Sequence, residues 1–217
     1  MTTPDPQPLP NQHATVGAAR LAARHEGRFS VETVQALILD SHRLLAATAR
    51  ITGHLNILAE RLAAERLDAL ASVQQAPGPR PPRVLFVCTQ NSGRSQLAAA
   101  LLAHRATGPV TISSAGTAPV ADVEPELARV LQEVGADLGP AFPKPLTQEV
   151  VEAADVVVTL GCGDACPVVP GRRYLDWPTD DPHGASVADL RRIRDAIDTH
   201  VSDLVASLAS PSTTETK

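Results

Sequence analysis

The sequence predicts an α/β fold, a three-layer sandwich around a parallel sheet, preceded by a small all-α bundle of three helices. Two observations lead to this division. From Val84 onward, short β-branched apolar runs alternate with longer segments of helical periodicity, as in a parallel sheet with crossover helices. Between residues 13 and 75 the chain carries only helical patterns, and a Pro-rich stretch separates this part from the rest.

Three helices are predicted in the N-terminal part. They span Ala14–Glu26, Val31–Arg50 and Thr52–Ser72, with Gly27 ending the first and Ser30 as the N-cap of the second. Apolar side chains recur at helical spacing along the second and third helices, as a small bundle requires: Val34, Leu37, Ile38, Leu45, Leu55, Leu58 and Leu62.

The predicted domain boundaries follow from this pattern. They are a disordered start at 1–12, the bundle at 13–75, a linker at 76–82, the α/β domain at 83–208 and a loose tail at 209–217. The linker holds four prolines in seven residues and cannot form a helix. A core of some sixty residues is marginal by itself. We therefore expect the bundle to dock on the α/β domain or on a second subunit, and a homodimer is one prediction.

Within the α/β domain, strands and helices alternate in a definite order. The last helix has Ser186 and Asp189 as a capping pair, and its apolar stripe is typical of a core-facing helix. The predicted elements are strand Val84–Val87, helix Ser95–Ala106, strand Val110–Ser113, helix Pro125–Val134, helix Gln148–Ala153, strand Val156–Leu160 and helix Val187–Leu208.

The turn from Cys88 to Arg94 is the most informative segment for function. It joins a buried strand to a helix, so its backbone N–H groups and the positive end of the helix dipole attract a tetrahedral oxyanion. The same field favours a thiolate, which predicts Cys88 as a nucleophile. The planar guanidinium of Arg94 is expected to donate to two oxygens of the anion, and Ser95 is expected to donate a hydrogen bond to the sulfur. The alternative is a small buried hydrophobe that ends a strand. The predicted anion-binding residues are Thr89, Gln90, Asn91, Ser92, Gly93 and Arg94.

The segment Val84–Leu97, read V-L-F-V-C-T-Q-N-S-G-R-S-Q-L, resembles the active-site loop of low-molecular-weight protein tyrosine phosphatases and of the arsenate reductases built on the same fold. The resemblance covers about Arg83 to Leu208. Gly93 and Gln96 stand where the phosphatases usually carry Cys and Pro, which favours the reductase branch. The bundle is similar to a three-helix extension found in some actinobacterial relatives. Some relatives bind a cation beside the loop, but Ala99 replaces an acidic ligand, so no metal is expected.

A pair of cysteines, Cys162 and Cys166, follows the predicted strand Val156–Leu160. Both therefore belong to the sheet edge where Cys88 also lies, and three neighbouring thiols suggest a thiol relay. The alternatives are inert buried thiols or a partner-binding loop, while a structural disulfide or a zinc site is disfavoured. In thioredoxin-coupled arsenate reductases this strand runs into T-L-C-G-D-A, and the resemblance implies redox roles for both residues, although Gly161 is inserted here.

Asp181 precedes Pro182 in the stretch Tyr174–Pro182. Asp-Pro alone describes a solvated turn equally well. The family keeps an Asp-Pro pair above the loop, so the resemblance implies that Asp181 is the general acid that protonates the departing oxygen.

The resemblance implies an enzyme that reduces arsenate to arsenite, for which phosphate or sulfate are mimics. Cys88 would form a thiol-arsenate adduct, Cys162 would attack it, and Cys166 would resolve the new disulfide for a thioredoxin-like reductant. Mycothiol with mycoredoxin is the other reductant considered. The rival functions are a phosphatase, which needs neither Cys162 nor Cys166, and a noncatalytic oxyanion sensor or adaptor.

Composition limits the other function classes. The net charge is −5 and there is no basic block, so nucleic acid is not an expected partner. No apolar stretch approaches the roughly 20 residues that span a bilayer, and the polar start of the chain lacks a secretory core. We expect a cytoplasmic protein with no membrane partner and no cofactor.

Overall fold

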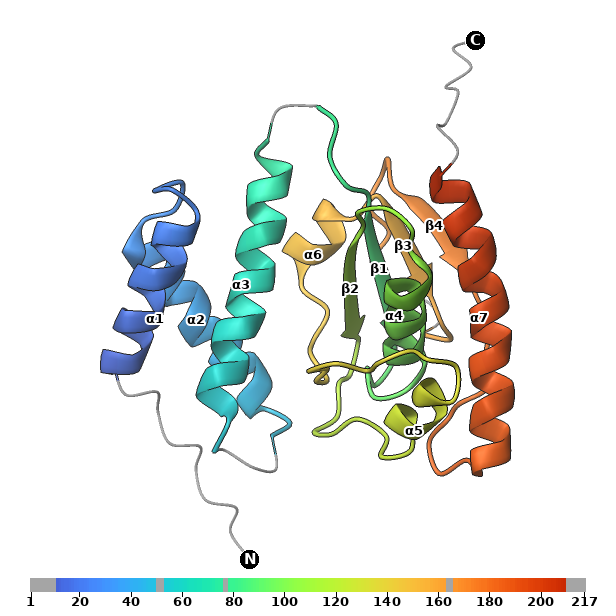
Figure 1. Cartoon of the computed structure of the whole chain (residues 1–217). Helices are drawn as coiled ribbons and strands as arrows, with labels where there is room; N and C mark the ends of the chain where they lie inside the picture. Colours follow the sequence, from blue (N-terminus) through green and yellow to red (C-terminus); the bar gives the residue numbers. More distant parts are fainter. Residues whose placement is uncertain (1–10, 50–52, 76–77, 163–165, 210–217) are drawn as a thin grey trace, which may run out of the picture.

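The computed structural model describes residues 11–49, 53–75, 78–162 and 166–209. A unit of three helices lies beside an α/β domain (Figure 1). The helices are α1 (Asn11–Arg24), α2 (Val31–Ala46) and α3 (Leu55–Val73). The predicted three-helix unit and α/β architecture are confirmed. Among the described residues, no helix is both long and apolar enough to cross a bilayer.

The bounds of the first three helices differ from those predicted. Helix α1 already begins at Asn11, inside the stretch expected to be disordered, whose residues 1–10 lie outside the described part. Helix α2 ends at Ala46 instead of Arg50 because the chain turns there, with the amides of Thr48 and Ala49 both donating to the carbonyl of Leu45. Helix α3 starts three residues later than predicted. Arg50, Thr52, residues 76–77 of the linker and the tail 210–217 are not described.

The sheet holds four parallel strands in the order β2-β1-β3-β4. Their bounds are Arg83–Cys88 for β1, Thr111–Gly116 for β2, Val156–Thr159 for β3 and Arg173–Asp176 for β4. The sequence prediction missed β4, a short edge strand whose residues are exposed or half-buried. Because the strands are parallel, their carboxyl ends meet at one edge, where Cys88 is opposite Gly116.

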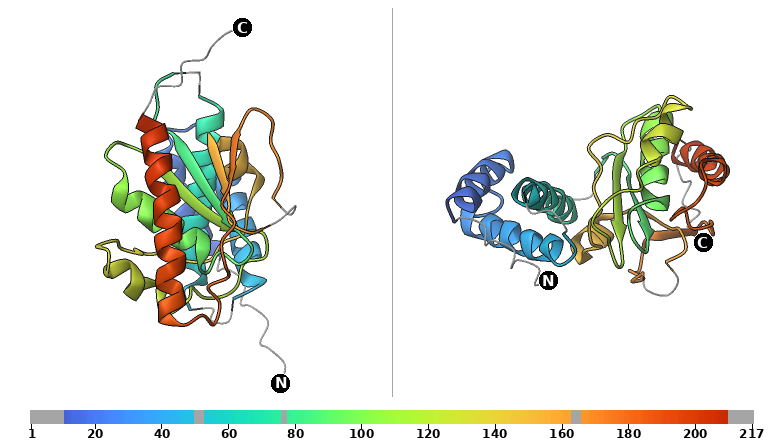
Figure 2. Two further views of the ribbon diagram at one scale, coloured as in Figure 1. Left: turned by 90° about the vertical axis from the view of Figure 1, so that its right-hand side faces the viewer. Right: turned by 90° about the horizontal axis from the view of Figure 1, so that it is seen from below.

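Helices cover both faces of the sheet (Figure 2). Helices α4 (Arg94–Arg105), α5 (Leu127–Gln132) and α7 (Val187–Ala209) lie on one face, and α6 (Gln148–Ala153) lies on the other. Alternate residues of β1 point to opposite faces. Val84, Phe86 and Cys88 pack in the larger core under α4 and α7, whereas Leu85 and Val87 pack in a smaller cluster beside α6.

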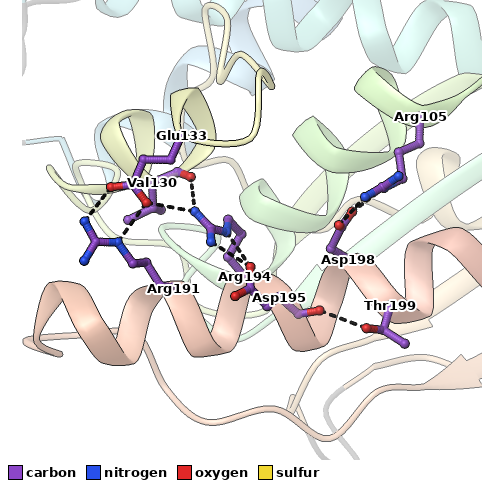
Figure 3. A network of polar contacts seen from close by, with 8 residues as sticks. All are labelled: Arg105, Val130, Glu133, Arg191, Arg194, Asp195, Asp198 and Thr199. Carbon is purple, nitrogen blue, oxygen red and sulfur yellow. Dashed lines mark hydrogen bonds and ion pairs between the residues drawn. The ribbon is translucent and has the colours of Figure 1, made fainter.

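Helix α7 is attached to its neighbours by charged side chains (Figure 3). Arg105 of α4 is paired with Asp198, and Glu133 after α5 accepts hydrogen bonds from Arg191 and Arg194. The hydrogen bond from Arg191, followed by that from Arg194, lowers the pKa of Glu133 to about 2. These contacts fix α7 against α4 and α5.

The predicted helix caps are both present. Ser30 Oγ accepts a hydrogen bond from the amide of Thr33 at 3.2 Å. At the start of α7, Ser186 Oγ accepts from the amide of Asp189 at 3.2 Å and donates to its carboxylate at 2.7 Å. In each case a hydroxyl satisfies an amide that the helix itself leaves unpaired.

The helical unit packs on the α/β domain through α3. Phe142 is buried among Leu45, Leu55, Ala59 and Leu62 of the helices. Lys144 Nζ forms an ion pair of 2.8 Å with Glu65, and Arg66 pairs with both Asp40 and Glu149 at 2.8 Å. The bundle therefore docks on the α/β domain of its own chain, while a homodimer stays a prediction.

Candidate active site

The turn between β1 and α4 encloses the sulfur of Cys88. The amide of Asn91 donates to Cys88 Sγ at 3.2 Å, and Ser95 Oγ lies 3.0 Å from the same sulfur. Because Ser95 Oγ accepts from Asn91 Nδ2 at 2.8 Å, its own hydrogen is free to point at the sulfur. Cys88 is only 1% exposed. Two donors therefore converge on one buried sulfur.

Asn91 shapes the turn. Its φ of 51° lies in the left-handed region, which Asn tolerates better than most residues. Its Oδ1 accepts from the amide of Lys144 at 2.9 Å, and its carbonyl accepts from Gln96 Nε2 at 3.1 Å. Gln96 Nε2 also lies 3.1 Å from the carbonyl of Phe142. The side chains of Asn91 and Gln96 thus tie the turn to the segment at residues 142–144.

The remaining residues of the predicted anion loop lie in the same turn. Ser92 is buried, with its Oγ donating to Gln90 Oε1 at 3.4 Å, and Thr89 Oγ1 donates to the carbonyl of Gly161 at 3.4 Å. A Cβ on Gly93 would lie 2.2 Å from Cγ of Pro182. Glycine at this position therefore allows the segment that carries Asp181 to rest directly on the turn.

The side chains of Arg94 and Asp181 lie close together beside the turn. Arg94 is 8% exposed, and its Nη2 lies 3.9 Å from Asp181 Oδ2. A Cβ on Gly161, whose φ is 72°, would lie 2.5 Å from Arg94 Nη1. The inserted glycine thus leaves room for the guanidinium, which is held between the loop after β3 and the Asp181 segment.

Two residues that sequence reasoning missed hold the Asp181 segment over the turn. The amide of His183 donates to Asp181 Oδ1 at 3.2 Å, and His183 Nδ1 is 2.7 Å from Glu124 Oε1. The amide of Glu124 in turn donates to the carbonyl of Ser92 at 3.0 Å. Hydrogen bonding to Glu124 raises the pKa of His183. No sequence pattern predicts the contact between His183 and Glu124, because the two residues are far apart along the chain.

Cys162 and Cys166 lie just beyond β3, as predicted, but on the other face of the sheet from Cys88. Both pack beside Val87 in the cluster near α6, and Cys162 Sγ is 3.8 Å from the carbonyl of Val87. All three cysteines are free. A hydrogen bond from Cys166 lowers the pKa of Cys162 to about 7, and the same contact raises the pKa of Cys166.

The side chains beside this turn are those that could hold a metal ion. Within the described ranges, no group of three or more His, Cys, Asp or Glu side chains is placed to hold a metal ion. Asn91 and Ser95 beside the turn are hydrogen-bonded to each other, and each contacts the sulfur of Cys88, Asn91 through its backbone amide. The site as a whole can bind a tetrahedral oxyanion, attack it with sulfur and protonate a leaving oxygen.

Comparison with known proteins matches both parts of the chain. Residues 15–71 match the model of a protein-tyrosine-phosphatase-like N-terminal domain, and residues 83–213 match the low molecular weight phosphotyrosine protein phosphatase family. A protein of Halobacterium salinarum, named provisionally as an arsenate reductase, is 35% identical over 124 residues, which are 55% of this chain and 87% of that protein.

Solved structures agree with this match. The thioredoxin-dependent arsenate reductase of Corynebacterium glutamicum is 41% identical and superposes with a TM-score of 0.81, covering 92% of this chain and 98% of that one. An arsenate reductase in a phosphate-binding state is 29% identical with a TM-score of 0.53, over 59% of this chain and 99% of that one. With its family match over more than half of the chain, this protein belongs to the low molecular weight phosphotyrosine protein phosphatase family.

Proposed function

We propose that this protein reduces arsenate to arsenite through a thiol-arsenate adduct on Cys88. The proposal rests on one combination of features. A turn with hydrogen-bond donors surrounds the sulfur of Cys88, and a pair of thiols, Cys162 and Cys166, lies beyond the neighbouring strand β3. A phosphatase needs the first of these features only. Reduction of arsenic by the thiols of this chain alone needs both, because two electrons must come from sulfur: Cys88 forms the adduct and a second thiol must attack it.

The first step is attack on arsenic. Arsenate is held by the amides of the turn and by the buried guanidinium of Arg94, which matches two oxygens of the anion. The Cys88 thiolate forms a sulfur–arsenic bond, and an oxygen departs with a proton from Asp181. The 3.9 Å between Arg94 and Asp181 supports this role, since a bound oxyanion on Arg94 would lie next to the acid.

The second step is reduction. The Cys162 thiolate attacks Cys88 Sγ, so that a disulfide forms while the electron pair of the sulfur–arsenic bond stays on arsenic, which leaves as arsenite. A pKa of about 7 supports Cys162 as the attacking thiol, because the attacking thiol is most effective when its pKa is near ambient pH. Cys162 packs on the α6 face and Cys88 on the α4 face, so their bond requires a rearrangement after β3.

The last step returns the enzyme to its starting form. Cys166, whose sulfur contacts Cys162, attacks Cys162 and releases Cys88, which leaves a Cys162–Cys166 disulfide. A thioredoxin-like protein then reduces this disulfide. The similarity to a thioredoxin-dependent arsenate reductase over 92% of the chain supports this reductant over mycothiol with mycoredoxin. We also propose that the reaction takes place in the cytoplasm.

Arsenate-dependent oxidation of NADPH through thioredoxin reductase and thioredoxin tests the proposal. Cys88→Ser should abolish it. Cys162→Ser should abolish thioredoxin-linked turnover while allowing one round of reduction with excess small thiol. Undiminished thioredoxin-linked turnover in Cys162→Ser protein would remove Cys162 from the mechanism.

A phosphatase is the second candidate, because a phosphocysteine mechanism uses a thiol nucleophile, an arginine and a general acid. Cys88 and Arg94 lie at the two ends of one turn, and Asp181 lies 3.9 Å from Arg94. The same protein assayed with an aryl phosphate and with arsenate separates the two functions. Turnover of the aryl phosphate that is unaffected by Cys162→Ser, without any arsenate reduction, would establish the phosphatase.

A further inference from the structure

A cavity of about 400 Å³ lies between the helical unit and the α/β domain, at the end of the sheet opposite the candidate active site. It is formed by the connection between α1 and α2, the end of α3 and the first residues of β1 and β2, which lie at the same end of the molecule (Figure 1). Arg83 begins β1 and Cys88 ends it, so the two sites are roughly 16 Å apart at about 3.3 Å per residue.

Arginine dominates the lining of this cavity. Arg24 and Arg28 come from the helical unit, while Arg80 and Arg83 come from the linker and β1. Arg24 is paired with Asp68 at 2.8 Å, and Arg80 holds Asp155 through two hydrogen bonds. Four arginines from the two parts of the chain thus line one cavity at their junction.

Two of these arginines, Arg28 and Arg83, are not held by an ion pair in the described part of the chain. Arg28 donates to the carbonyl of Ala71 at 3.1 Å, and neither Arg28 nor Arg83 forms an ion pair with any residue that the structure describes. Burial, with a smaller contribution from the charge of Arg80, lowers the pKa of Arg83, although Asp68 and Asp155 oppose this effect. The lining holds four arginines against two carboxylates, those of Glu26 and Asp68, so it carries an excess of positive charge.

A buried histidine supplies independent evidence for a ligand. The side chain of His25, which also lines the cavity, is 8% exposed. Its Nε2 forms no hydrogen bond with any described residue, and the nearby carboxylate oxygen Asp68 Oδ1 lies 3.5 Å away, an ion-pair distance when His25 is protonated. A buried polar atom without a partner is rare in folded proteins, and a ligand that accepts a hydrogen bond would satisfy it.

We propose that this cavity binds a phosphate group, which pairs with Arg28 and Arg83 and accepts a hydrogen bond from His25. The bound phosphate then joins the helical unit to the α/β domain. Arginine suits this role because its planar fork pairs with two phosphate oxygens at once. The volume exceeds that of a single phosphate, and Ser72, Gln75 and Thr111 offer polar partners to a short hydroxylated group. A small phosphate ester is therefore a better fit than a nucleotide, for which the lining provides no Phe, Tyr or Trp.

Equilibrium dialysis of the full-length protein with radiolabelled inorganic phosphate or glycerol 3-phosphate tests this proposal. The candidate active site also binds phosphate under the proposed function, so the measurement uses Arg94→Gln protein, in which that site is impaired. We expect one binding site to remain. Adding Arg28→Gln or Arg83→Gln should weaken it at least tenfold, whereas Arg129→Gln, the same charge change on the exposed surface, should not.

The outcomes separate the proposals. Absence of binding to the Arg94→Gln protein, or equal binding after Arg28→Gln and Arg83→Gln, would overturn the junction site and leave the proposed arsenate reductase untouched. Tighter binding of glycerol 3-phosphate shows that the site recognises an ester, and equal or weaker binding shows that it recognises the phosphate group alone. Because Arg83 is partly buried, circular dichroism checks its folding, and the exposed Arg28 gives an answer in either case.

Discussion

The amide of Lys144 donates a hydrogen bond of 2.9 Å to Oδ1 of Asn91, the residue whose own amide contacts the sulfur of Cys88. Lys144 Nζ is at the same time paired with Glu65 of α3. A continuous set of polar contacts therefore runs from the helical unit to the nucleophile. The unit that precedes the α/β domain is in this way part of the support of the active-site turn.

Gln96→Leu tests this support. Gln96 is 4% exposed and donates to the carbonyls of Asn91 and Phe142, so a leucine of similar size leaves both without that donor. A buried unsatisfied acceptor costs about 1–3 kcal/mol. We expect a loss of about 2 kcal/mol in the free energy of unfolding and a roughly tenfold lower kcat/KM for arsenate. Gln148→Leu, on the exposed start of α6, is the control. Equal stability and activity of the two variants would contradict a supporting role for Gln96.

Gly93→Ala tests the contact between the turn and the Asp181 segment. The added Cβ would meet Pro182 Cγ at 2.2 Å, so the ring must shift, and we expect the neighbouring Asp181 to shift with it. General acid catalysis is worth about 10²–10⁴-fold. We expect kcat for arsenate reduction to fall by about tenfold to hundredfold, because the acid is displaced rather than removed. Gly108→Ala is the control, because its added Cβ would meet no atom within 4 Å, and it should leave kcat unchanged. Normal kcat in Gly93→Ala would show that Asp181 is not held by this contact.

The sequence predicted the elements that place the site better than it predicted the contacts within it. A β-branched run before Cys88 and a helical pattern after Arg94 are local signals, and both elements form where expected. Strand β4 lacked such a signal, since its Arg173, Tyr174 and Asp176 are polar and it pairs only with β3. An edge strand of this kind is recognised by its neighbour in space rather than by its own periodicity.

The polar contacts between residues distant along the chain could not be predicted from the sequence either, because they too depend on neighbours in space. Asn91 meets a backbone amide 53 residues away, and a backbone amide carries no residue-specific signal. The sequence also placed Cys162 at the correct edge of the sheet but could not tell which face it occupies. The face depends on how the chain turns at Gly161, where φ is 72°.

Glu124→Gln tests the contact between Glu124 and His183, which holds the Asp181 segment over the turn. Glu124 raises the pKa of His183 above its ordinary value of 6.5 through a hydrogen bond and through its charge. The ion pair is therefore complete below pH 6.5 and is lost as the pH rises through the raised pKa. We expect the NMR titration midpoint of His183 to move down toward 6.5 in Glu124→Gln protein. Glu126→Gln, a nearby acid that pairs with Arg129 instead, should leave it in place. An unchanged midpoint in Glu124→Gln would mean that the pair does not form in solution.

Cys166→Ala tests how the second thiol is activated. The contact with Cys166 is the largest cause of the low pKa of Cys162, while burial acts in the opposite direction. Removing the Cys166 sulfur should therefore raise the pKa of Cys162 well above 7, and its alkylation at pH 7 should slow by at least about tenfold, because only the thiolate reacts. The measurement compares Cys88→Ser protein with and without Cys166→Ala, so that Cys162 is the reacting thiol in both. Equal rates at pH 7 would show that Cys166 does not activate Cys162, and its part in the relay would be limited to resolving the disulfide.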